Sequence, residues 1–269
     1  MRNPPLMARG IATARGDGNA PIPLVAVAHG SEDERSSHTV EQIFARVRRL
    51  RPDLDVRVAY LDHVSPSAEE AITAVAAEGA GEVVVLPALL TAAYHSKIDL
   101  PAVLERIRES CPWLHIHYAN TLGPHPLLLD AVEQRLEEAG AVAAPDTSLV
   151  LASAGSSDAG ANHVIEQMAS ALAARGPWRQ VTPAYASAAS PTPAEAVAHL
   201  RASGAHKVAV AGYLLAPGFF SDRVADQSFA NGAAAVAPAL GDAPQLARVI
   251  LGRYESAKHR VPLSGITTG

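Results

Sequence analysis

The feature that most constrains this chain is an internal repeat, because the second half follows the first at a constant spacing of 125 residues. The stretch VAVAHGS, which ends at Ser31, is matched by LVLASAGS, which ends at Ser156. Two further junctions keep the same spacing, Pro66 with Pro191 and Leu90 with Leu215. Only the last segment slips, since TLGPHP at residue 121 meets ALGDAP at residue 239, a spacing of 118. The 269 residues are therefore predicted to form two similar folding units.

Each unit alternates short valine-rich runs with amphipathic segments, a pattern typical of a parallel sheet flanked by helices. In the first unit we expect strands at 23–28, 55–61, 82–89 and 114–118, and helices at about 36–51, 66–79, 99–110 and 125–139. The predicted fold class is α/β, with two tandem, structurally similar open parallel-sheet units facing each other across a cleft.

The repeat also predicts the domain organisation. We expect a disordered tail at 1–22, a first unit at 23–142, a degenerate second unit at 146–257 and a tail at 258–269.

Composition excludes several classes of protein. The longest apolar runs are too short to span a bilayer as a helix, and the first residues lack the apolar core of a secretory signal, so we expect a cytoplasmic protein. A net charge of −5 with scattered basic residues argues against nucleic-acid binding. The single cysteine, Cys111, excludes an intramolecular disulfide framework and a four-cysteine cluster within one chain.

Polar side chains follow the predicted strands of the first unit. They are His29 after the first strand, Asp62 and His63 after the second, Tyr94 and His95 beyond the third, and His125 after the fourth. Because parallel strands point the same way, their distal ends meet at one edge of the sheet. The sequence therefore predicts several imidazoles and a carboxylate at one cleft.

The second unit has lost these polar groups. The matching positions hold Ala154, Ser187, Phe219, Phe220 and Ala243. The fold therefore does not require the polar set, and we expect a single active cleft in which the second unit forms the other wall. A capping or buried role for His29, and a loop or capping role for Asp62, remain as alternatives. The serine after the glycine is kept in both units, which favours a turn role for Ser31 over a nucleophilic one.

Motifs for other chemistries are absent from the sequence. It has no phosphate-binding P-loop, no dinucleotide-binding glycine motif, no zinc-protease helix motif and no nucleophile elbow. Neutral imidazoles near pH 7 can bind a divalent transition metal or accept a proton, and a neighbouring carboxylate can orient them.

Three stretches of the first unit resemble one known family. They are AHGS at the first strand end, YLD followed by PS after the second, and PALLTAAYHSKIDLP at 87–101. Together they resemble the class II tetrapyrrole chelatases, the sirohydrochlorin cobalto- and ferrochelatases (CbiX/SirB-like). The resemblance covers most of 24–140, and the degenerate copy extends it to about residue 256.

The resemblance implies a site and a reaction. It makes His29 and His95 the metal-site histidines, with Asp62 where relatives usually carry glutamate. It implies ATP-independent insertion of Fe²⁺ or Co²⁺, with Ni²⁺ as a further candidate, into sirohydrochlorin with release of two protons. The metal is then a substrate, and no cofactor is bound permanently.

The same resemblance implies how the acidic substrate is held. Lys97 and Arg35 are the candidates to meet its carboxylates, and Phe219 and Phe220 to pack near the plane of the macrocycle. The loop HGSEDER departs from the family, because Glu32 and Glu34 stand where relatives often have arginine and proline.

Other functions remain open from the sequence. The chain could be a non-catalytic carrier of tetrapyrrole or metal, or a two-lobed periplasmic-type binding protein, although it shows no signal segment. The sequence leaves open the physiological metal, the siroheme or cobalamin pathway, and whether Asp62, His63 or His125 assists the two main histidines. The oligomeric state is open as well; because one chain carries both halves of the cleft, it could build the cleft as a monomer.

Overall fold

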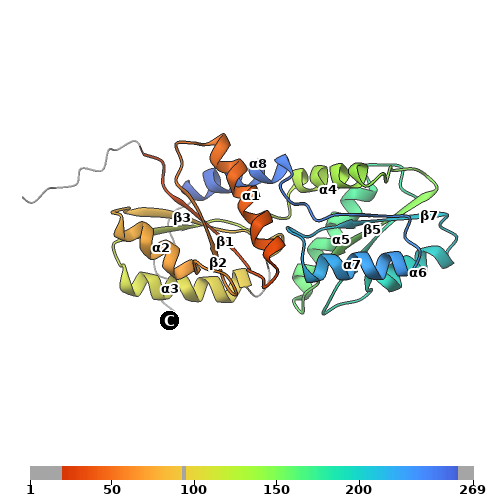
Figure 1. Ribbon diagram of the computed structural model, residues 1–269, viewed down its shortest axis with the longest axis horizontal. Helices are drawn as coiled ribbons and strands as arrows, with labels where there is room; N and C mark the ends of the chain where they lie inside the picture. The colour runs from red at the N-terminus through yellow and green to blue at the C-terminus, as the bar shows by residue number, and fades with distance from the viewer. Residues whose placement is uncertain (1–19, 93–94, 260–269) are drawn as a thin grey trace, which may run out of the picture.

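The computed structural model describes residues 20–92 and 95–259, with the side chains of residues 95 and 96 outside that description. The predicted tails therefore lie largely outside the described residues. Figure 1 shows two α/β units side by side. The first comprises β1 (Leu24–Ala28), α1 (Glu34–Leu50), β2 (Val56–Tyr60), α2 (Ala68–Ala77), β3 (Glu82–Pro87), the π-helical turn η1 (His95–Asp99), α3 (Leu100–Ser110), β4 (His115–Tyr118) and α4 (Pro126–Glu138). Every strand and helix predicted for this unit is present, with ends within two residues of the prediction.

The second unit repeats this order of elements. It comprises β5 (Thr147–Ser153), α5 (Ala159–Ala173), β6 (Gln180–Tyr185), α6 (Pro193–Ala202), β7 (Lys207–Gly212), α7 (Phe219–Ala230), β8 (Ala235–Ala237) and α8 (Pro244–Lys258). The sheets have the orders β2-β1-β3-β4 and β6-β5-β7-β8, and all of their strands are parallel. The predicted α/β class with two tandem parallel-sheet units is confirmed.

Matching caps start the matching helices of the two units. Helix α2 begins with a capping box between Ser67 and Glu70, and α6 begins with one between Thr192 and Glu195. In each box the hydroxyl accepts a backbone N–H while the carboxylate accepts the N–H of the capping residue, so two otherwise unpaired donors are satisfied. The repeat therefore preserves the local signals that begin its helices as well as its apolar pattern.

The last helix of each unit packs on the sheet of the other unit. Helix α4 packs against β7 and β8, whereas α8 packs against α1, β3 and β4. Figure 1 shows this exchange, with α8 lying over the first unit beside α1 and α4 lying over the second. The predicted boundaries at 23–142 and 146–257 stay a prediction about the sequence repeat, because in space each unit is completed by a helix of the other.

Two arginines fix the exchanged helices in equivalent ways. Arg135 of α4 donates through Nε and Nη2 to the carbonyl oxygen of Leu240, at 3.0 and 2.8 Å. Arg253 of α8 donates through Nη2 to the carbonyl oxygens of Leu122 and Pro124, each at 3.0 Å. Arg135 and Arg253 are 118 residues apart, as are Leu122 and Leu240, so this is the spacing seen in the last segment of the repeat.

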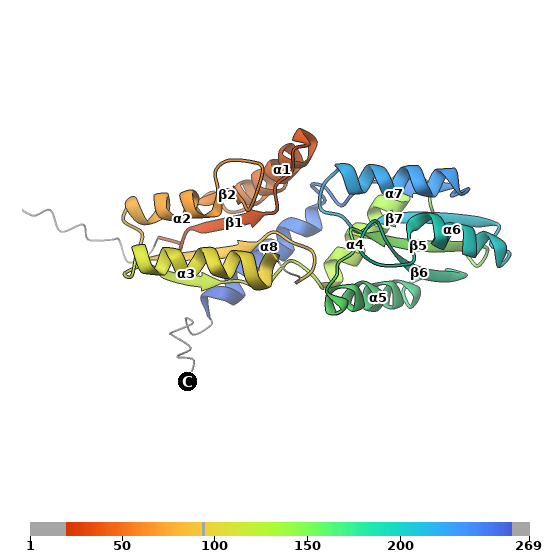
Figure 2. The ribbon, with the colours of Figure 1, turned by 90° about the horizontal axis from the view of Figure 1, so that it is seen from below.

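The hydrophobic core follows from the exchange. The sheet faces covered by α1, α4, α5 and α8 share one continuous cluster of buried residues from both units. The opposite faces have separate clusters, one under α2 and α3 and one under α6 and α7. Figure 2 shows α2 and α3 together in the first unit and α6 and α7 together in the second. Because close-packed interiors resist deformation, the shared cluster fixes how the two sheet edges face each other. Within the described parts of the chain, no helix is long and apolar enough to cross a membrane.

Candidate active site

A cavity of about 1110 Å³ lies between the two units. It is lined by the loops that follow β1 and β3 in the first unit and β5 and β7 in the second, with His63 and Ala188 from the loops after β2 and β6. These loops are at the carboxyl ends of parallel strands, where open α/β sheets bind ligands. The volume lies just above the range of about 300–1,000 Å³ that is usual for small-molecule sites, which suits a large ligand.

His29 is the first residue after β1, and it is exposed and lines the cavity. Its Nδ1 lies 3.0 Å from the carbonyl oxygen of Gly30. A carbonyl can only accept, so Nδ1 carries the hydrogen and the lone pair of the neutral ring is on Nε2. In that tautomer Nε2 carries the lone pair through which an imidazole binds metals.

The two residues that follow His29 have structural roles that both units share. A Cβ atom added to Gly30, whose φ is +92°, would lie 1.8 Å from the carbonyl oxygen of Asp62. One added to Gly155, whose φ is +82°, would lie 2.0 Å from that of Ser187. Only glycine allows this close approach of neighbouring loops. The glycine of the motif is therefore required by the fold, in contrast to the histidine.

The serine after each glycine closes a turn that leads into a helix. Ser31 Oγ accepts the backbone N–H of Asp33 at 3.1 Å, and Ser156 Oγ accepts that of Asp158 at 3.0 Å. The two aspartates are the N-caps of α1 and α5. The turn role expected for the serine is confirmed by this geometry.

Asp62 contacts His29 with its backbone and not with its carboxylate. Its N–H donates to the carbonyl oxygen of His29 at 3.0 Å. Its exposed carboxylate accepts the backbone N–H of His63 at 2.8 Å, and Asp62 is not among the residues that line the cavity. The structure thus places His29 and His63, rather than Asp62, on the cavity wall.

The remaining predicted histidines differ in position. The backbone of His95 begins η1, while its side chain lies outside the described residues. His125 is the N-cap of α4, where its Nδ1 accepts the N–H of Leu127 at 3.1 Å. Burial lowers the pKa of His125, with nearby Arg253 as a second cause. His125 therefore has a structural role in starting the exchanged helix.

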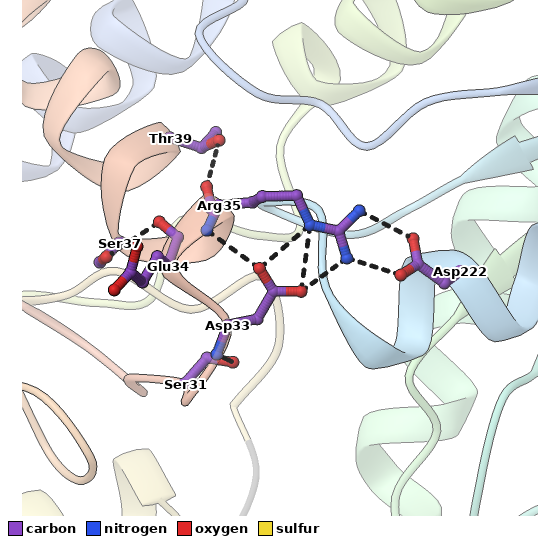
Figure 3. A network of polar contacts seen from close by, with 7 residues as sticks. All are labelled: Ser31, Asp33, Glu34, Arg35, Ser37, Thr39 and Asp222. Carbon is purple, nitrogen blue, oxygen red and sulfur yellow. Dashed lines mark hydrogen bonds and ion pairs between the residues drawn. The ribbon is translucent and has the colours of Figure 1, made fainter.

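Arg35 forms one ion pair within its own unit and one that crosses the cleft (Figure 3). Its Nη2 lies 2.6 Å from Asp33 Oδ2 and 2.6 Å from Asp222 Oδ2, the latter on α7 of the second unit. Hydrogen bonding to Arg35 is the main cause that lowers the pKa of Asp33. The guanidinium expected to meet substrate carboxylates is thus already held by two carboxylates of the protein.

Lys97 forms a second ion pair across the cleft, with Nζ 2.6 Å from Asp158 Oδ2. The hydrogen bond from Lys97 is the main cause that lowers the pKa of Asp158. Residues 97 and 222, like residues 33 and 158, are 125 positions apart. The two cross-cleft contacts are therefore equivalent at one end, residues 97 and 222, whereas the counterpart of Arg35 is Gly160.

Phe219 and Phe220 line the cavity at the start of α7, with exposed fractions of 67% and 38%. Their ring centroids are 5.4 Å apart in an edge-to-face arrangement. Two adjacent exposed rings form a contiguous apolar patch, and such patches often mark binding surfaces. The second unit therefore presents two aromatic rings to the cavity.

The sequence reasoning missed two buried hydroxyl groups on the cavity wall. Ser153 and Tyr213 both line it, and neither hydroxyl has a hydrogen-bond partner among the described residues. Their counterparts in the first unit are Ala28 and Ala88. A search of the repeat for positions where the second unit has a polar residue and the first has an apolar one would have found them.

The fold and the cavity define the class: a two-unit α/β protein with a cleft between its units and histidines on the wall formed by the first unit. No group of three or more histidine, cysteine, aspartate or glutamate side chains that could hold a metal ion occurs within the described part of the chain. The chain belongs to the CbiX family, whose model matches residues 23–139 and again residues 148–257. The resemblance noted from the motifs is thereby confirmed.

Named relatives are similar over most of the chain. A sirohydrochlorin ferrochelatase of Priestia megaterium is 28% identical over 207 residues, which cover 76% of this chain and 77% of the relative. A sirohydrochlorin cobaltochelatase of the same organism is 28% identical over 204 residues, which cover 75% of this chain and 66% of the relative. The solved structure of SirB from Bacillus subtilis with Fe³⁺ matches with a TM-score of 0.77 and 22% identity, covering 89% of this chain and 96% of that one. This structural match supports the fold.

Proposed function

We propose that this chain is a sirohydrochlorin chelatase that inserts Fe²⁺ or Co²⁺ into the metal-free tetrapyrrole. The observation that carries the proposal is a difference between the two copies of a duplicated motif. Both units keep the glycine and serine that shape the loop, but only the first keeps a histidine, His29, on the shared cavity. The activities named for the relatives in Priestia megaterium support the same reaction.

The chemistry of insertion suits this cavity. The metal must lose water ligands, and two pyrrole N–H protons must leave before four nitrogens can hold it. In this proposal His29 Nε2 binds the metal, and His95 is the second metal-site histidine. Imidazole suits first-row divalent metals, and affinity alone distinguishes them poorly, so both Fe²⁺ and Co²⁺ are expected as substrates. The reaction proceeds without ATP, in keeping with the absence of a P-loop motif from the sequence.

The second unit supplies the surface on which the macrocycle lies. The exposed rings of Phe219 and Phe220 offer apolar area to a flat conjugated ligand. Arg35 and Lys97 bind carboxylates of the substrate. Arg35 then releases Asp222, and Lys97 releases Asp158. Exposed ion pairs contribute little to stability, so such an exchange costs little. Asp62 acts through the neighbouring ring of His63.

The decisive experiment is an anaerobic insertion assay with sirohydrochlorin in large excess over protein. A chelatase converts many equivalents of tetrapyrrole per protein with Fe²⁺ or Co²⁺, followed by the change in the absorption spectrum. A carrier would convert or bind at most one equivalent, and that result would reject the proposal. Adding and omitting ATP in parallel tests the predicted independence from nucleotide.

A further inference from the structure

His63 occupies a distinctive position on the cavity wall beside the His29 loop. Its ring lies between two carboxylates, with Nδ1 3.8 Å from Glu32 Oε1 and Nε2 3.4 Å from Asp62 Oδ2. The side chain of His63 is 38% exposed and that of Glu32 is 90% exposed. Both residues line the cavity, so this pair joins the cavity to the solvent.

The backbone around His63 does not require a histidine. His63 has a φ of 62°, in the left-handed region that favours glycine, and its counterpart Ala188 has a φ of 56°. An alanine therefore adopts the same conformation in the same loop of the second unit. The counterpart of Glu32 is Ser157, which has no charge. Like His29, the His63–Glu32 pair occurs only in the first unit.

The proposed reaction needs a base other than the metal ligand. His29 has one lone pair in its neutral form, on Nε2, and a lone pair bound to a metal cannot also accept a proton. Each metal inserted displaces two protons from pyrrole nitrogens. A second imidazole that is close to the cavity and also open to solvent meets this need.

Other titratable groups described on the cavity wall are already occupied or are poor bases. Asp33 and Asp222 are held by Arg35. Burial raises the pKa of the Tyr60 and Tyr213 hydroxyls, which keeps them neutral. Among the wall residues that the structure describes, Glu32 and His63 are the remaining titratable pair besides His29.

We propose that His63, assisted by Glu32, is the proton relay of this site, an inference that rests on the proposed chelatase function. Each pyrrole N–H bond breaks with its electron pair left on the nitrogen, which then binds the metal. The proton passes to a ring nitrogen of His63, and the imidazolium is stabilised by the carboxylates of Glu32 and Asp62. The imidazolium then releases the proton to water at the exposed side of Glu32, so His63 is neutral again for the second proton.

The test compares His63→Ala with the wild type in buffers of low and high concentration. Ala188 shows that alanine fits this backbone, and His63→Asn is a second variant because asparagine tolerates a positive φ. We expect kcat to fall about 100-fold, the usual size of a general-base contribution, with KM for sirohydrochlorin unchanged. A high concentration of a morpholine buffer that does not bind metals should restore much of the rate in the variants and leave the wild type unaffected. Glu32→Gln should give a smaller decrease in kcat.

His38→Ala is the matched control, because His38 is an exposed histidine of α1 that hydrogen-bonds Gln42 outside the cavity. Its rate should equal that of the wild type. If His63→Ala and His63→Asn fold and keep the full rate, or lose rate without any response to buffer, the relay is wrong while the chelatase proposal stands. If the wild type itself shows no turnover with either metal, the chelatase proposal fails, and the relay fails with it.

Discussion

The two units of this protein share a backbone and differ in chemistry. Each has a glycine at which two loops nearly touch, a serine that closes a turn and an aspartate that caps a helix. Only the first carries His29, His63 and Glu32 on the cavity, whereas the second carries Phe219 and Phe220. The comparison separates residues that the fold requires from residues that a function requires, within a single chain.

The second unit also differs from the first by polar and aromatic side chains that it alone carries on the cavity. The second unit has no histidine at its strand ends, yet it holds the aromatic wall and the two buried hydroxyls of Ser153 and Tyr213. Because α4 and α8 are exchanged, the units cannot separate without exposing their shared core. The second unit is therefore a permanent wall of the cavity of the first.

The largest expected effect is on catalysis by the first unit. His29→Ala should lower the insertion rate at least about 100-fold, because it removes the imidazole proposed to bind the metal. The thermal unfolding temperature should stay near that of the wild type, since the second unit folds with Ala154 at this position. Steady-state insertion assays and thermal unfolding measure the two effects. A His29→Ala protein with the wild-type rate would remove the main support for the proposed function.

The shared glycines should be equally important to both units. Gly30→Ala and Gly155→Ala each force a Cβ atom against a backbone carbonyl oxygen, at 1.8 and 2.0 Å. Each should lower the free energy of unfolding by more than about 2 kcal/mol, since separating the loops would break the backbone hydrogen bond between them, from Asp62 to His29 or from Ser187 to Ala154. Urea unfolding measures this change. Gly79→Ala is a control for a positive φ without a clash, as nothing lies within 4 Å of the added atom. A much smaller effect at Gly155 than at Gly30 would show that the structural equivalence is incomplete.

Removing either partner of the Arg35–Asp222 ion pair should change KM for sirohydrochlorin, in opposite directions for the two partners. Arg35→Gln removes a cation proposed to bind a substrate carboxylate, so KM for sirohydrochlorin should rise about 10-fold. Asp222→Asn removes the competing carboxylate from Arg35, so KM should fall. In both variants kcat should stay near the wild-type value. If both substitutions change KM in the same direction, the ion pair serves to hold the two units rather than to compete with substrate.

The smallest expected effect concerns the starts of the exchanged helices. His125 caps α4 through Nδ1, whereas the equivalent Ala243 has no side-chain cap on α8. The pKa of His125 is lowered in the folded state, so the unfolded chain binds the proton more readily. Stability from this group is therefore complete above about pH 6.5 and decreases as the pH falls below that value, by about 1 kcal/mol for a lost cap. Urea unfolding between pH 5 and 7.5 tests this.

His125→Asn provides the control for that measurement. Asparagine is a strong N-cap that does not titrate in this range, so the variant should keep stability near neutral pH and lose this part of the pH dependence. An unchanged pH dependence in His125→Asn would assign the effect to another histidine.

Much of the candidate site could be predicted from the sequence because the chain contains its own comparison. The spacing of 125 residues aligned His29 with Ala154 and predicted that the polar groups belong to one side of one cleft. The order of the elements followed from apolar periodicity, which directly records whether a segment is buried on one face or two. These features are local, so a single sequence specifies them.

Partners across the cleft could not be predicted, because they depend on where loops from different units meet. The sequence predicts that Lys97 and Arg35 bind carboxylates of an acidic substrate. In the structure Lys97 pairs with Asp158, and Arg35 pairs with Asp33 and Asp222. From the sequence one can infer that a charged side chain must be solvated or paired. Which partner it pairs with depends on the fold. The pairing of His63 with Glu32 likewise depends on where their two loops meet.

The sequence by itself determined that the chain forms two α/β units and which positions of the repeat hold histidine in one unit only. The tertiary structure alone decided that α4 and α8 cross to the opposite sheets, and hence that the two units share one core. The physical reason is that an amphipathic helix buries its apolar stripe equally well against any complementary sheet face. Its sequence therefore records that a face must be covered, while the choice between the two sheets depends on connection geometry and on contacts such as Arg135 with Leu240 and Arg253 with Leu122.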